Sequence, residues 1–323
     1  MQLSLETIAG RIRHAKSVAI FTHMRPDGDA LGSALAIGRA LDFLQVQNEV
    51  CVETELPSNL AFLQGIDKVK KAPSKPYDML VCVDCSDVQR LGALSDEFLS
   101  ATRKNIETVN IDHHVSNTRF AKMNFVRTCS ANCMNVFALI TYMGTPLDKI
   151  TAEYLLTGLL TDSGNFSHDD VTEETFTLAA RLTKAGADIR TLQYELFKKQ
   201  PRARAELHAM AMSGMRYAHN NRFAFAVVTR VMLAKCGADA NLTEGFVDFP
   251  LSIDGVEVAA TLLEVKFRQY KVSLRSKQYA DVNKIAGVYG GGGHVRAAGC
   301  MLFGDLEDVI DKLTFTVSQY LND

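Results

Sequence analysis

Short apolar runs alternate with helix-like segments in the first half of the chain. Four runs, at residues 17–23, 48–53, 78–84 and 107–112, have the length and apolar character of strands buried on both faces. Segments with apolar residues at helical spacing lie between or after them, at 30–44, 95–103, 133–142 and 150–160. Strands alternating with helices predict an α/β fold with a doubly wound parallel sheet.

The second half of the chain has a different pattern. Residues 172–212 are mostly helical in pattern and carry several Lys and Arg residues, which suggests a connector between domains. After them, residues 222–229, 256–265 and 269–276 resemble β-strands, and residues 306–321 resemble a terminal helix. These elements predict a smaller α/β domain with a mixed sheet.

The length of the chain supports this division. A chain of 323 residues is too long for one ordinary core and suits two domains of common size. We therefore predict a first domain over residues 1–190, a helical linker over 191–213 and a second domain over 214–323.

Composition and charge narrow the class of protein. Hydrophobic residues make up 47% and charged residues 22% of the chain, the balance of a soluble globular protein. No apolar run approaches the roughly 18 residues that cross a bilayer. The N-terminus lacks the pattern of a signal peptide, so we expect a cytoplasmic protein with no membrane partner. A net charge of −2 favours a small or short anionic substrate over a long nucleic acid.

The cysteines do not indicate a metal or redox site. Cys82 and Cys85 form a C-x-x-C pair, a spacing found in metal and redox sites. They lie in a strand-like run, where an odd spacing places two side chains on opposite faces. We therefore expect buried thiols rather than a metal or redox pair.

Acidic and histidine side chains follow several of the apolar segments. They are His23, Asp27, Asp29, Asp84, Asp112, His113, His114 and Asp162. A single Asp after a strand is usually a turn or a helix cap, so each position alone is a weak signal. In a doubly wound sheet, however, the carboxyl ends of the strands meet at one crevice. Carboxylates and imidazoles together suit Mn, Fe or Zn, and two such ions about 3.5–4 Å apart can clamp a phosphate.

A run of glycines marks the second domain. Residues 290–293 are all Gly and precede His294. Four glycines make a plain helix or strand unlikely, because ordering them is entropically costly. Such a run either forms a flexible hairpin loop or lets backbone N–H groups approach a phosphate.

These motifs in this order resemble the DHH phosphoesterases over nearly the whole chain. The pattern H-x-x-x-D-x-D is followed by V-D-C-S-D, D-H-H and L-T-D-S-G, and the GGGGH run resembles a motif of the DHH-associated C-terminal domain. The resemblance is greatest to NrnA-type enzymes, which degrade short oligoribonucleotides and dephosphorylate 3′-phosphoadenosine 5′-phosphate (pAp). One departure is visible: the helix after D-H-H often begins with a Glu in relatives, and TCSANCMNVF has none. The role of that helix stays open.

The resemblance implies roles for the candidate residues. One metal would be held by His23, Asp27 and Asp84. The other would be held by Asp29, Asp84, His113 and Asp162, with Asp84 as the bridge. The ions would be two divalent cations, Mn²⁺ first and Mg²⁺ or Co²⁺ as alternatives. His114 would join Asp84 as a catalytic residue beside the scissile phosphate, and Asp112 would orient a neighbouring His.

The resemblance also assigns a substrate role to the second domain. The residues that would bind the substrate are Arg275, Ser276, Gly291, Gly292, Gly293 and His294. The expected reaction is two-metal hydrolysis of short oligoribonucleotides to 5′-mononucleotides and of pAp to AMP. A phosphodiesterase acting on cyclic or linear dinucleotides, such as cyclic-di-AMP or pApA, would have the same catalytic residues. A non-catalytic nucleotide-binding regulator is the other alternative, and a homodimer stays open.

Overall fold

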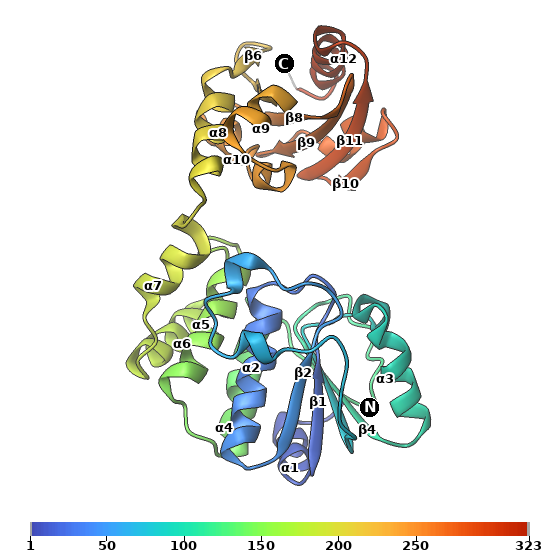
Figure 1. Cartoon of the computed structure of the whole chain (residues 1–323), viewed down its shortest axis with the longest axis vertical. Helices are drawn as coiled ribbons and strands as arrows, with labels where there is room; N and C mark the ends of the chain where they lie inside the picture. The colour runs from blue at the N-terminus through green and yellow to red at the C-terminus, as the bar shows by residue number, and fades with distance from the viewer. Residues whose placement is uncertain (1, 322–323) are drawn as a thin grey trace. The chain divides into compact units, whose positions relative to one another are not determined.

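The computed structural model describes residues 2–321 and divides into two compact units, Met1–Lys199 and Gln200–Asp323 (Figure 1). The division falls inside the stretch predicted as a linker, residues 191–213. Within the described residues, no helix is both long and apolar enough to cross a membrane.

The first unit is built on a parallel sheet. Its five described strands lie in the order β2-β1-β3-β4-β5, and every neighbouring pair is parallel. The bounds are β1 Ser17–Phe21, β2 Gln47–Cys51, β3 Met79–Val83, β4 Glu107–Asp112 and β5 Met123–Val126. The chain leaves β1 toward β2 on one side and returns to β3 on the other, so the order reverses between β1 and β3. Ligands of such sheets bind at this switch point, beyond the carboxyl ends of the strands.

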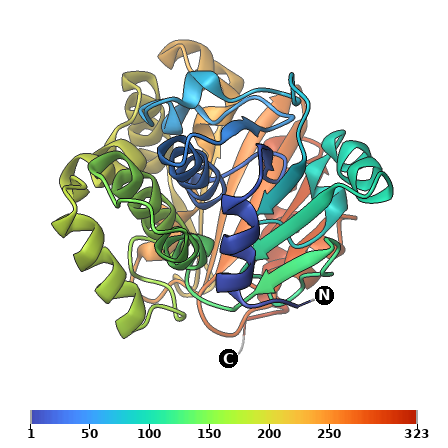
Figure 2. The same cartoon turned by 90° about the horizontal axis from the view of Figure 1, so that it is seen from below.

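Helices cover both faces of this sheet, as predicted for a doubly wound fold (Figure 2). The helices on one face are α1 Leu5–Arg13, α2 Gly28–Phe43, α4 Asn132–Met143 and α5 Lys149–Asp162. Helix α3, Leu94–Arg103, lies on the other face. The strands alternate accordingly: Val18 and Ile20 of β1 pack in the core with α2, whereas Phe21 packs with Phe98 of α3.

The rest of the first unit is helical or irregular. Its remaining elements are α6 Glu173–Lys184, α7 Ile189–Gln193, the π-helix η4 Tyr194–Lys198 and the short turns η1 Ser58–Leu60, η2 Ile66–Lys68 and η3 Val88–Leu91. Helix α6 packs against α5, the helix that ends at Asp162.

The second unit has a mixed sheet of six described strands in the order β10-β11-β9-β8-β7-β6. The bounds are β6 Arg216–Ala218, β7 Phe223–Val228, β8 Val258–Lys266, β9 Gln269–Ser276, β10 Gly292–His294 and β11 Ala297–Phe303. Strands β7 and β8 are parallel, and the other pairs are antiparallel. The predicted smaller α/β domain with a mixed sheet is thus confirmed.

Helices complete the second unit. They are α8 Arg202–Ser213, α9 Arg230–Cys236, η5 Ala240–Thr243, α10 Asp248–Ser252, α11 Val282–Gly287 and α12 Leu306–Ser318. One core cluster joins Val272 of β9 to Ile285 of α11 and Leu313 of α12. This core is separate from the cores of the first unit.

The glycine run is more ordered than its composition suggests. Residues 292–294 form the short edge strand β10, so the prediction that a strand is unlikely there is wrong. The glycines are needed because β10 lies very close to β11. A Cβ on Gly291 would lie 2.2 Å from the carbonyl oxygen of Gly299, and one on Gly293 would lie 2.4 Å from that of Ala297. Only residues without a side chain fit this approach.

The C-x-x-C pair also differs from its prediction. Strand β3 ends at Val83, and Asp84 adopts a left-handed backbone with φ of 52°. This turn breaks the alternation, so Cys82 and Cys85 pack in the same core cluster and not on opposite faces. Both are buried free thiols.

Candidate metal centre

The side chains at the centre of the site follow the ends of three neighbouring strands. His23 lies two residues after β1, Asp84 follows β3 directly and His113 follows β4 directly. Because β3 pairs with both β1 and β4, the ends of all three strands meet at the switch point of the sheet. The fold therefore brings together segments that are 90 residues apart in sequence.

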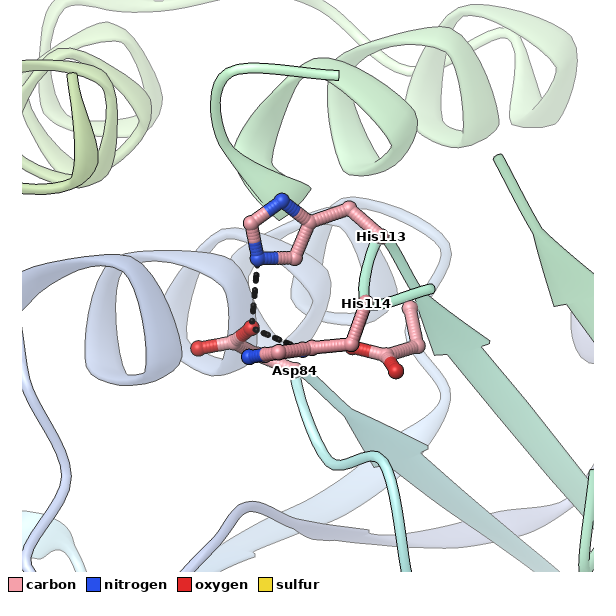
Figure 3. A group of neighbouring side chains, drawn as sticks. Asp84, His113 and His114 are labelled. Atoms are coloured by element: carbon pink, nitrogen blue, oxygen red, sulfur yellow. Dashed lines mark hydrogen bonds and ion pairs between the residues drawn. The ribbon is translucent and has the colours of Figure 1, made fainter. Parts of the chain in front are cut away.

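Asp84 lies at the centre of this group, where both adjacent histidines face the same carboxylate oxygen (Figure 3). Its Oδ1 is 3.4 Å from His113 Nε2 and 3.7 Å from His114 Nδ1. Its Oδ2 is 3.6 Å from His23 Nε2. Asp84 is only 2% exposed, and Oδ1 has no hydrogen-bond partner among residues 2–321. A buried carboxylate oxygen without a partner is costly, and a bound cation is a natural partner for it.

Two sets of three candidate ligand atoms include or adjoin this carboxylate. The first is His23, Asp27 and Asp84, and the second is Asp29, His113 and Asp162. Within each set the ligand atoms lie within 4.8 Å of one another. His113 Nε2 is 3.4 Å from Asp162 Oδ2 as well as from Asp84 Oδ1. Asp84 thus belongs to the first set and also contacts His113 of the second.

Backbone carbonyls fix how two of the imidazoles are presented. The Nδ1–H of His23 donates to the carbonyl of Met24 at 2.8 Å, and that of His113 donates to the carbonyl of Cys129 at 2.8 Å. In the neutral rings, these bonds leave the Nε2 lone pairs directed at the carboxylates. This arrangement is usual for histidines that bind metals.

His114 has a different hydrogen bond. Its Nδ1–H donates to Asp112 Oδ1 at 2.8 Å, and Asp112 is fully buried. The ring stands edge-on to that of His113, with centroids 4.5 Å apart. Although Asp84, Asp112, His113 and His114 also form a group within 4.8 Å, the Asp112 bond commits Nδ1 of His114 and leaves its Nε2 for other partners.

Close packing of α2 on α5 joins the remaining carboxylates. Asp29 lies in the first turn of α2, and Asp162 ends α5. The helices approach through two glycines: a Cβ on Gly32 would lie 2.3 Å from the carbonyl of Tyr154, and one on Gly158 would lie 2.6 Å from Asp29 Oδ1. Small residues at these positions let Asp29 and Asp162 reach the same set.

The N-terminus of α4 receives the buried carboxylate of Asp29. Its Oδ1 accepts from the backbone N–H of Cys133 at 2.8 Å, and its Oδ2 accepts from that of Asn132. The first N–H groups of a helix favour a negative charge. Burial nevertheless raises the pKa of Asp29 well above its usual value, and the charges of Asp84 and Asp162 raise it further.

The electrostatics of the cluster show an excess of negative charge. Burial raises the pKa of Asp162 to about 6, with a contribution from Asp84. Burial opposes the charged forms of Asp84 and His113 as well, but their mutual contact outweighs it. The contact between Asp84 and His113 lowers the pKa of Asp84. Together with the charge of Asp29, it raises the pKa of His113 to about 10. The raised pKa values of Asp29, Asp162 and His113 show that the negative charges here favour a nearby positive charge, which divalent cations would supply. The donor set, imidazole nitrogens with carboxylate oxygens, fits such cations.

The predicted substrate residues lie together in the second unit. Ala297 of β11 pairs with Arg275 of β9 on one side and with His294 of β10 on the other. Arg275 and His294 therefore share one row across the sheet, beside exposed Gly292 and Gly293. Ser276 is buried, and its hydroxyl donates to the carbonyl of Ala280 at 2.6 Å.

Sequence reasoning missed the polar residues that support the site. Asn110 and Asn117 are buried and form hydrogen bonds around Asp112 and the carbonyl of Cys85. A signal was present, because Asn110 is a polar residue inside an apolar strand and lies on the same face as Asp112, two residues later.

The chain matches known proteins along nearly its whole length. Residues 17–159 match the DHH family, N-terminal domain, and residues 221–323 match the DHHA1 domain. The bifunctional oligoribonuclease and PAP phosphatase NrnA of Thermus thermophilus is 31% identical, covering 94% of this chain and 90% of that protein. The protein of the same name from Bacillus subtilis is 25% identical, covering 89% and 90%. The crystal structure of an exopolyphosphatase-related protein from Bacteroides fragilis superposes with a TM-score of 0.83 at 25% identity, over 98% of this chain and 96% of that one.

Proposed function

The chain belongs to the DHH family of phosphoesterases, and on that premise we propose that it hydrolyses short oligoribonucleotides to 5′-mononucleotides and pAp to AMP. It is a hydrolase with a cluster of Asp and His side chains suited to divalent metals. The observation that carries the proposal is that Asp84 belongs to one ligand set and contacts His113 of the other, while Asp112 holds the neighbouring His114.

The residues of the cluster would hold two divalent ions, with Mn²⁺ preferred and Mg²⁺ or Co²⁺ as alternatives, as the resemblance implies. His23, Asp27 and Asp84 would hold one, and Asp29, Asp84, His113 and Asp162 the other. When bound, such ions polarise a phosphate and make water a nucleophile at neutral pH. Asp84 would be the ligand common to both sets, because its buried carboxylate contacts His23 through one oxygen and His113 through the other.

His114 would act on the phosphate itself. Its Nδ1–H is held by Asp112, so its Nε2 is directed by that bond and is left to other partners. In the neutral ring Nε2 would accept; with a second proton taken up at Nε2 the ring is an imidazolium, which Asp112 would stabilise, and it would donate that proton to a phosphate oxygen or to the leaving oxygen and return to the neutral form. Asp112, which is fully buried, would set the orientation of the ring.

The second unit would hold the rest of the substrate. The guanidinium of Arg275 can fork onto a terminal phosphate. Gly292 and Gly293 are exposed and carry no side chain, so an anion can approach the backbone there, although the N–H of Gly293 already donates to Asn283 Oδ1 at 2.8 Å. His294 lies in the same row of the sheet as Arg275. The names of the Thermus and Bacillus relatives, which join oligoribonuclease and PAP phosphatase activity, support this substrate class.

A substrate panel tests the proposal. Protein stripped of metal and reloaded with Mn²⁺, Mg²⁺ or Co²⁺ would be given a dinucleotide, RNAs of about 5 and 24 residues, pAp, a cyclic dinucleotide and pyrophosphate. We expect mononucleotides from the dinucleotide and AMP from pAp, with Mn²⁺ giving the fastest turnover and the long RNA cleaved slowest.

Two results would contradict this specificity. Cleavage of the cyclic dinucleotide alone would make the chain a cyclic-dinucleotide phosphodiesterase. Cleavage of pyrophosphate alone would remove the role given to the second unit and keep only the metal site.

A further inference from the structure

Asn117 is a buried side chain beside the site to which the reaction described above gives no task. It lies in the loop after β4, three residues after His114, and is 8% exposed. Its Nδ2 lies 2.6 Å from Asp112 Oδ2, 2.8 Å from Asn110 Oδ1 and 3.1 Å from the carbonyl oxygen of Cys85, and the two hydrogens of the amide are shared among these three acceptors.

The orientation of this amide is fixed by a hydrogen bond from the backbone two residues later. The Oδ1 of Asn117 accepts from the N–H of Arg119 at 2.7 Å, a local bond that asparagine forms readily in turns. Oδ1 must face that donor, so the NH₂ group must face the three acceptors. The amide cannot be turned around without losing both sides of the network.

The bond to Asp112 completes a relay to His114. One oxygen of the Asp112 carboxylate accepts from His114 Nδ1 at 2.8 Å, and the other accepts from Asn117. A carboxylate held at one oxygen only can rotate about its side-chain bonds. Asn117 removes that freedom and so fixes the direction of the His114 ring.

The same amide joins this relay to the loop that carries Asp84. The carbonyl of Cys85, the next residue after Asp84, accepts from both Asn117 and Asn110. Thr118 donates its backbone N–H to the carbonyl of Ser86 at 2.8 Å. Hydrogen bonds therefore join the loops after β3 and β4 next to Asp84.

We propose that Asn117 is a positioning residue that sets the tautomer and direction of His114 through Asp112 and holds that ring in register with Asp84. The kinetic part of this inference rests on the proposed function, whereas the part that concerns the ring does not. A residue that merely stabilised the loop would affect folding but would not select the state of one imidazole.

The ring is observed directly in metal-free protein labelled with ¹⁵N-histidine. Long-range ¹H–¹⁵N spectra report which nitrogen of a neutral imidazole carries the proton, and a His114→Gln variant assigns the signal. We expect the Nδ1–H form of His114 to dominate in the wild type and to lose that dominance in Asn117→Ala. Asn117→Ser, which keeps one donor, is a second variant in case the alanine variant does not fold.

Asn124 provides a matched control. It is fully buried and Asn117 is nearly so, but among residues 2–321 the side chain of Asn124 bonds only to the backbone of Ala121, at 2.7 and 3.2 Å. Asn124→Ala should destabilise the unit and leave the His114 spectrum unchanged. An unchanged His114 tautomer in both Asn117 variants, or the same change in Asn124→Ala, would overturn the proposal.

A double-mutant cycle tests the consequence for turnover. Asn117→Ala should lower kcat by about 10- to 100-fold, the usual effect of removing a support of a site residue, with KM changed by less than about threefold. In the His114→Gln background the same change should lower kcat by less than about twofold, because the residue acts through His114. Equal losses in both backgrounds would contradict the relay. If no substrate of the panel is turned over, the proposed function fails while the spectra still decide the role of Asn117.

Discussion

The two adjacent histidines, His113 and His114, differ in what holds each ring. The carbonyl of Cys129 holds His113 and directs its Nε2 at Asp84 and Asp162. The carboxylate of Asp112 holds His114. Identical side chains at neighbouring positions are thus held differently, which is consistent with the roles we propose for them, His113 as a metal ligand and His114 beside the phosphate.

This difference predicts opposite defects in two matched variants. His113→Gln removes a ligand, so it should weaken Mn²⁺ binding by about 10-fold or more, measured by titration calorimetry. His114→Gln should bind Mn²⁺ as the wild type does and lower kcat by about 100-fold, the range for loss of a positioned proton donor. Loss of Mn²⁺ binding in His114→Gln would show that this ring is a ligand instead.

At the scale of residues, the sequence predicted which side chains converge but not how they are held. The D-H-H triplet and the Asp after β3 were recognisable, because acidic residues at strand ends in a parallel sheet meet at one edge. The left-handed backbone of Asp84 was not, and it overturned the alternation expected for Cys82 and Cys85. The supporting bonds of Asn117 span loops that only the fold brings together.

Helices α2 and α5 carry Asp29 and Asp162 of the site, and an ion pair near the opposite ends of these helices joins them. Arg39 of α2 donates through Nε to both oxygens of Asp148, at 3.0 and 2.9 Å, and Asp148 caps the N-terminus of α5. The bond from Arg39 is the main cause that lowers the pKa of Asp148 from 3.8 to about 2.

This pair predicts a pH-dependent contribution to stability. Since the folded pKa of Asp148 is depressed, its contribution is present above pH 3.8 and is lost as pH falls from there to about 2. Asp148→Asn keeps a capping side chain and should lower the free energy of unfolding by about 1 kcal/mol at pH 7, with the difference shrinking at low pH. Urea unfolding at several pH values measures it. Glu55→Gln, which breaks a fully exposed pair with Lys71, should show no such difference, and equal effects in both variants would contradict the assignment.

In the second unit, β10 lies so close to β11 that one added methyl group at Gly291 should weaken substrate binding. Gly291→Ala should displace β10, because its Cβ would lie 2.2 Å from a backbone oxygen. We expect KM for pAp to rise by about tenfold with Mn²⁺ binding unchanged, as for loss of binding that is equal in ground and transition states. Gly287→Ala, which has nothing within 4 Å of its Cβ, is the control. A normal KM in Gly291→Ala would remove β10 from the substrate site.

At the scale of elements, strands that form apolar runs were predicted well, and strands without such a run were not. The predicted strands at 17–23, 78–84 and 107–112 correspond to β1, β3 and β4. Strand β5, Met123–Val126, was not predicted, because four residues are too few to show a period and its pairing with β4 is set by the fold. Strand β10 was missed because its glycines serve a close backbone contact that composition does not reveal.

The whole molecule combines two units with separate cores, and the matched domains fall one in each. The sequence predicted both sheets because alternating and helical periods report burial directly. It could not fix the boundary, since helical residues continue from α6 to α8 on both sides of Lys199. The predicted division of labour, with metals in the first unit and substrate in the second, gives each unit a task that can be tested separately.

The most direct measurement is turnover and Mn²⁺ stoichiometry in Asp84→Asn. Asn has nearly the shape of Asp and tolerates the left-handed backbone at this position, so the fold should persist. The wild type should bind two Mn²⁺ ions per chain. The variant should bind fewer, and its kcat for a dinucleotide and for pAp should fall on the order of 1,000-fold, the cost of losing several kcal/mol of charge stabilisation by the metals. Turnover within about tenfold of the wild type, in a variant that has lost an ion, would show that hydrolysis does not depend on a carboxylate shared by two metals.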